Sequence, residues 1–105
     1  MTSAAIQVLP EVGIDADAEL VRIVDEVIAY IASTGLTYYV GPFETTIEGD
    51  DYDQIMEIVT NCQKIAIQAG CPSVNSYVKI SYKPEGKILS IDEKVGKYHN
   101  EEAGK

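Results

Sequence analysis

The side chains best suited to chemistry in this chain are aromatic and polar residues on segments whose composition predicts β-strands. They are Tyr39, Glu48, Asn75 and Tyr77. β-Branched and aromatic residues surround them, as is typical of strands. Alternate residues of a strand share one face, so the alternation places all four on the same face of a sheet. The same rule adds Gln7, Lys79, Glu44 or Thr46, and at the edge Leu9. A tyrosine ring can stack on a flat ligand and a carboxylate can oppose a positive charge, so these types favour binding.

The residues that catalysis and metal binding usually need are scarce. One histidine, His99, lies near the C-terminus, and the two cysteines, Cys62 and Cys71, do not have the spacing of zinc ligands. A Ser-His-acid triad cannot be argued around that histidine, and no glycine-rich phosphate loop is present. The acids at 50–53 fall at a predicted helix start, where capping accounts for them. We expect a protein that is not an enzyme and has no resident cofactor or metal.

Both thiols are expected to stay free. Cys62 lies in a predicted helix and Cys71 just beyond its end. Roughly nine residues at about 1.5 Å each hold them well beyond the roughly 7 Å that a disulfide allows between Cα atoms.

Composition limits the class of protein. The chain has 105 residues, 46% of them hydrophobic, and a net charge of −9. This length fits one domain, 1–105, and the acidic surface makes nucleic acid a poor partner. The charge serves either solubility or attraction of a cationic ligand, and it does not distinguish the two. No long apolar run occurs and the first basic residue is Arg22, so we expect a soluble, cytoplasmic protein without a membrane partner.

The order of predicted elements defines the fold. A strand at 4–9 precedes an amphipathic helix, which Asp15 or Asp17 caps and Gly35 ends. A hairpin follows, with strands at 38–40 and 43–48. A second helix at 51–69, capped by Asp50 or Asp51 and ended by Gly70, leads to a strand at 73–82. This order predicts an α+β, ferredoxin-like βαββαβ sandwich: a four-stranded antiparallel sheet with two helices on one face.

The other sheet face has no predicted helix to cover it. An uncovered face with tyrosines favours a ligand or a second subunit, although a half-polar face can also be left in water. Residues 88–95 are expected to form a short strand or helix against a neighbour, and 99–105 a disordered tail. The loop after the first strand lacks the arginine of acylphosphatases and the cysteine pair of small copper carriers.

Four stretches of this sequence resemble the thiamine-binding protein family, a YkoF-like group formerly of unknown function. They are IQVLP, TGLTYYVGPFETTIEGD, VNSYVKI and IDEKV, and the resemblance covers residues 4–96. It implies a ferredoxin-like fold, assembly through the sheets into a homodimer or homotetramer, and binding of thiamine or its pyrimidine portion without catalysis.

The resemblance also implies site residues. Thr45 and Glu48 match family positions, while Asn75, Ser76 and Tyr77 lie where last-strand residues of the family approach the ligand. With Tyr39 added, the predicted ligand-binding set is Tyr39, Thr45, Glu48, Asn75, Ser76 and Tyr77. The remaining alternative is a regulatory or protein-interaction module that uses the uncovered face and binds no vitamin.

Overall fold

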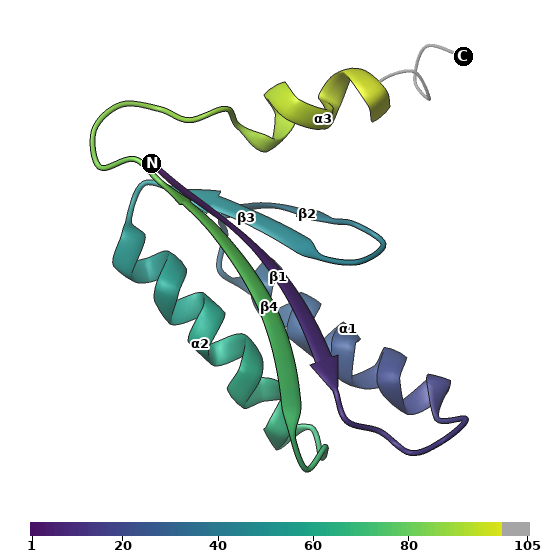
Figure 1. Ribbon diagram of the computed structural model, residues 1–105. Coiled ribbons are helices and arrows are strands. Elements are labelled where there is room, and N and C mark those ends of the chain that lie inside the picture. The colour runs from purple at the N-terminus through teal and green to yellow at the C-terminus, as the bar shows by residue number, and fades with distance from the viewer. Residues whose placement is uncertain (100–105) are drawn as a thin grey trace.

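A computed structural model describes residues 1–99 and confirms the ferredoxin-like arrangement (Figure 1). The elements are β1 (Thr2–Pro10), α1 (Asp17–Ser33), β2 (Thr37–Val40), β3 (Thr45–Gly49), α2 (Tyr52–Gln68), β4 (Val74–Tyr82) and α3 (Ile91–His99). The sheet has the order β2-β3-β1-β4 with every neighbouring pair antiparallel. Helices α1 and α2 cover one face. Of the expected tail 99–105, only His99, the last residue of α3, falls within the described residues.

The ends of the two long helices follow local chemistry. Asp51 Oδ1 accepts hydrogen bonds from the backbone amides of Asp53 and Gln54, at 2.9 and 3.2 Å, and so caps α2 as predicted. Gly35 and Gly70 follow α1 and α2 with φ of 79° and 122°, the left-handed conformation that glycine adopts without strain. The predicted cap of α1 is wrong: Ala16 occupies the N-cap position and no side chain caps it.

The core lies between the sheet and these two helices. Its buried residues are Ala4, Ile6, Ile23, Val27, Ile31, Ile47, Ile55, Ile58, Val59, Cys62, Ala66 and Cys71. Both cysteines are buried, and both are free; the free state confirms the prediction. The Cys71 thiol donates to the Ala66 carbonyl at 3.0 Å, and burial raises the pKa of the Cys62 thiol to about 11.

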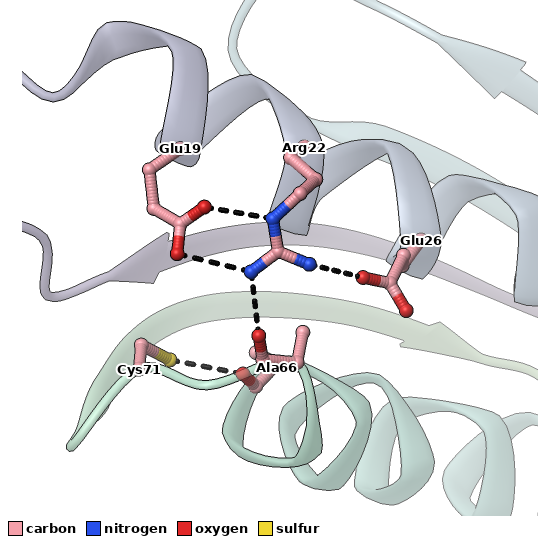
Figure 2. A network of polar contacts seen from close by, with 6 residues as sticks. Glu19, Arg22, Glu26, Ala66 and Cys71 are labelled. Carbon is pink, nitrogen blue, oxygen red and sulfur yellow. Dashed lines mark hydrogen bonds and ion pairs between the residues drawn. The ribbon is translucent and has the colours of Figure 1, made fainter.

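Arg22 joins the two long helices at one end of the molecule (Figure 2). Its guanidinium pairs with Glu19 and Glu26 on α1 and donates to the Ala69 carbonyl at the end of α2, at 2.6 Å. The hydrogen bonds from Arg22 lower the pKa of Glu19. These charges are half exposed, so their value lies in aligning the helices more than in ion-pair energy.

Two expectations about the sheet are corrected. The second hairpin strand begins at Thr45, two residues later than predicted, because the Gly41 amide bonds the Glu44 carbonyl at 2.9 Å and closes a longer loop. Phe43 lies in that loop, 78% exposed. The second sheet face is also not free of helices, because α3 lies across it, on the opposite side from α1 and α2 (Figure 1). Within residues 1–99, every helix is too short or too polar to cross a membrane.

Candidate functional site

On the face of the sheet that α1 and α2 leave open, the register of the strands determines which side chains are cross-strand neighbours. Pairing places Tyr39, Thr46, Ala5 and Lys79 in one row across all four strands. The next row contains Thr37, Glu48, Ser3 and Ser81. The first row has the small side chains of Thr46 and Ala5 at its centre and Tyr39 and Lys79 at its sides, whereas the second row has Glu48 beside Ser3 at its centre.

A cleft of about 330 Å³ lies between these rows and α3. Its floor includes Ser3 and Ala5, whose small side chains leave room above β1. Tyr39 from β2 and Lys79 from β4 line its sides. Helix α3 contributes Ile91, Lys94 and Val95. This volume is at the lower end of small-molecule sites, roughly 300–1,000 Å³.

Two caps satisfy the first turn of α3, and one of them comes from the sheet. Ser90 and Glu93 form a capping box: the Ser90 amide donates to Glu93 Oε1 at 2.8 Å, and the Glu93 amide donates to Ser90 Oγ at 3.0 Å. The Ser90 backbone and hydroxyl hydrogen bonds lower the pKa of Glu93. From β3, Glu48 Oε1 accepts the Ile91 amide at 2.6 Å, so a carboxylate of the sheet fixes the start of the helix.

The Ser90-x-x-Glu93 spacing was the available signal for this helix. It is the sequence pattern of a helix start. Ile91, directly after Ser90, and Val95 are four residues apart and therefore share a helical face. The sequence is compatible with either a strand or a helix at 88–95. The structure makes 91–99 the helix that completes the cleft.

The cleft has mixed charge. Lys79 Nζ lies 3.0 Å from Glu44 Oε2, and both residues line the cleft. Lys94 also lines it, and its ammonium has no ion pair or hydrogen bond within residues 1–99. The described part of the chain holds no group of three or more histidine, cysteine or acidic residues placed to bind a metal.

The predicted ligand-binding residues separate into three places. Tyr39 lines the cleft, and Glu48 stands beside it with one oxygen bonded to Ile91. The backbone amide that donates to Glu48 is that of Ile91 in α3. Asn75 and Tyr77 share the open face but lie outside the cleft, where Tyr77 is 67% exposed.

Thr45 and Ser76 lie on the opposite face of the sheet, so the six predicted residues do not form one group. Thr45 is buried opposite Ile6, and Ser76 stands opposite Val8. The reason is the alternation of a strand: Asn75 and Tyr77 point to one face, and Ser76 between them must point to the other. The residues that sequence reasoning missed are Lys94 and the hydroxyls of Ser3 and Ser81.

These features define a class: a ferredoxin-like sandwich whose second sheet face carries a cleft covered by a short helix. The chain matches the family described as thiamine-binding protein over residues 4–99, and it belongs to that family. The resemblance seen in the sequence is thereby confirmed.

Three relatives show the extent of the similarity. The UPF0045 protein of Clostridium perfringens is 48% identical over 96 residues, which are 91% of this chain and 95% of that protein. A Bacillus cereus domain of unknown function has a TM-score of 0.79 at 32% identity, covering 95% and 91% of the two chains. A Thermotoga maritima protein, assigned provisionally to thiamine biosynthesis or salvage, has a TM-score of 0.76 at 34% identity, covering 93% and 98%.

Proposed function

We propose that this protein binds thiamine or its pyrimidine portion without converting it, in the cleft between the open sheet face and α3. Family membership over residues 4–99 is the observation that carries the proposal. The cleft gives it a location, because it is the hollow on the open face that combines an aromatic ring, hydroxyl groups and charged side chains.

The lining suits the two rings of thiamine. Tyr39 offers a flat surface to the aminopyrimidine or to the cationic thiazolium, and a cation–π contact contributes about 0.5–2 kcal/mol. The Glu44 carboxylate also lines the cleft, where it pairs with Lys79 at 3.0 Å. The Thr46 hydroxyl, in one row with Tyr39, can donate to or accept from the pyrimidine edge. Glu48 acts indirectly in this proposal, by positioning α3.

The proposal extends to assembly. The part of the open face beyond α3 carries Leu9, Asn75 and Tyr77, with Leu9 38% and Tyr77 67% exposed. An exposed aromatic and apolar patch of this kind favours a subunit contact. We place a homodimer or homotetramer contact there, beside the cleft, and the protein in the cytoplasm.

Calorimetric titration of the assembled protein with thiamine and with the free pyrimidine is the deciding experiment. Binding that weakens roughly 2- to 30-fold in Tyr39→Leu supports stacking in the cleft. Tyr77→Leu is the matched control, because it removes the same ring from the open face outside the cleft. Loss of binding in the control alone would move the site to the subunit contact.

A protein-interaction module is the second candidate. The exposure of Tyr77 favours it, since a partner protein would bury that ring as well as a second subunit would. Absence of thiamine and pyrimidine binding at millimolar concentration would exclude the first proposal and favour this one.

A further inference from the structure

From the charges and hydroxyls of the cleft we infer that it takes its ligand as a phosphate ester, with Lys94 and the Ser3–Ser81 pair holding the phosphoryl group. The inference rests on the proposed function and names the chemical form of the same ligand. It concerns the part of the cleft away from Tyr39.

The first observation is the local charge. The chain carries a net charge of −9, with 17 acidic and 8 basic residues. The cleft lining differs from this balance, because it contains Lys79 and Lys94 but a single acid, Glu44, while Glu48 stands just outside it with one oxygen bonded to the Ile91 amide. Glu44 pairs with Lys79 at 3.0 Å, so Lys94 brings a positive charge that no described residue neutralises. Such a cleft attracts an anion into an otherwise acidic molecule.

The second observation is a set of unused hydroxyl groups. Ser3 and Ser81 are cross-strand partners on the floor of the cleft, and Ser3 is only 7% exposed. Neither hydroxyl makes a hydrogen bond to another residue within 1–99. Ser3 is buried and Ser81 is exposed, and each hydroxyl has a donor to offer to a bound group. A phosphoryl group provides three strong acceptor oxygens, which match one ammonium and two hydroxyls.

The third observation is the position of these groups relative to the aromatic side. Tyr39 and Thr46 belong to the first row of the open face, whereas Ser3 and Ser81 belong to the next row, toward Glu48 and the start of α3. Lys94 comes from α3 above. A ligand with its rings on Tyr39 and a phosphoryl group on the second row would therefore span the cleft. A carboxylate ligand would use the same charges but offers fewer acceptor oxygens.

The test compares thiamine, thiamine monophosphate and inorganic phosphate by calorimetry. Wild type is expected to bind thiamine monophosphate at least tenfold more tightly than thiamine, and added salt should reduce that difference. Lys94→Gln should weaken monophosphate binding by about ten- to hundredfold relative to thiamine binding, and thiamine affinity itself should not fall, because the charge removed is positive.

Two further variants make the test specific. Lys97→Gln removes an equal charge from the same helix, but Lys97 lies over the Tyr98 ring and outside the cleft, so the preference should persist. Glu44→Gln frees Lys79, and it should strengthen monophosphate binding several-fold relative to thiamine.

The outcomes separate the two proposals. Equal binding of thiamine and its monophosphate, unaffected by Lys94→Gln, overturns the phosphate inference and leaves thiamine binding in place. An equal loss of the preference for the monophosphate in Lys94→Gln and Lys97→Gln would also overturn the inference. It would mean that the net charge of the protein, and not a contact from Lys94, causes the preference. Absence of binding by thiamine and by its monophosphate refutes the proposed function, and the inference falls with it.

Discussion

Removing the Glu48 carboxylate should release α3 from the sheet without unfolding the protein. Glu48 Oε1 accepts the Ile91 amide at 2.6 Å, and this bond joins β3 to the first residue of the helix. The helix has nine residues, and isolated helices shorter than about 12–15 residues are marginal in water. Its order must therefore come from its caps and from contact with the sheet. In Glu48→Ala, one of those caps is lost.

The size of the effect follows from the kind of bond. A hydrogen bond to a charged, half-buried group contributes about 1.5–3 kcal/mol. The free energy of local opening of α3 should fall by this amount, and amide protection in 91–94 by about 10- to 150-fold. The core cluster contains no residue of α3, so the free energy of global unfolding should change much less.

Hydrogen exchange measured by mass spectrometry on native protein resolves the two processes. Glu44→Gln is the control, because it changes a carboxylate of the same cleft that pairs with Lys79 and, within residues 1–99, makes no hydrogen bond to the start of α3. Protection of α3 in Glu48→Ala equal to that of wild type would refute the reasoning. So would an equal loss of protection in β1 and α2, since it would mean that α3 and the core open together.

Three further predictions concern the rest of the fold. Asp51→Ala should lower the free energy of unfolding by about 0.5–2 kcal/mol in urea denaturation, because two α2 amides lose their acceptor. Asp53→Ala, in the first turn of α2, should lower the free energy of unfolding by less. Burial raises the pKa of the Cys62 thiol from 9.0 to about 11, so ionisation favours the unfolded state; stability should be constant below pH 9 and fall toward pH 11. The same titration on Cys62→Ala should lack that fall. Light scattering should find an oligomer that Tyr77→Asp dissociates, and a wild-type monomer at micromolar concentration would contradict the assembly proposal.

The helices and strands could be predicted because their signals are local. Asp51 and Gly70 mark the ends of α2 by capping and by positive φ, and apolar spacing marks its buried side. Alternation then placed Tyr39, Asn75 and Tyr77 on the correct face. The error at Phe43 arose because β-branched and aromatic composition extends into the loop, whereas the strand start depends on the Gly41–Glu44 hydrogen bond.

The site was less predictable because it depends on contacts distant in sequence. The cleft exists where α3 crosses rows that begin at residue 3 and end at residue 81. Neither the unused hydroxyl of Ser3 nor the position of Lys94 can be read from periodicity. Thr45 and Ser76 entered the predicted set through matching of family positions, and such matching does not distinguish ligand contacts from core positions on the other face.

The dependence of the cleft on α3 has a thermodynamic consequence for binding. If the ligand binds only the docked form, its apparent dissociation constant equals the intrinsic value divided by the docked fraction. Glu48→Ala then weakens binding only to the extent that it depopulates the docked form, although Glu48 does not line the cleft. By linkage, a saturating ligand should restore α3 protection in that variant. Direct contact of Glu48 with the ligand predicts a different result: in Glu48→Gln, which keeps an acceptor for the Ile91 amide, binding would fall while α3 stays protected. The comparison of the two variants thus separates positioning of the helix from recognition of the ligand.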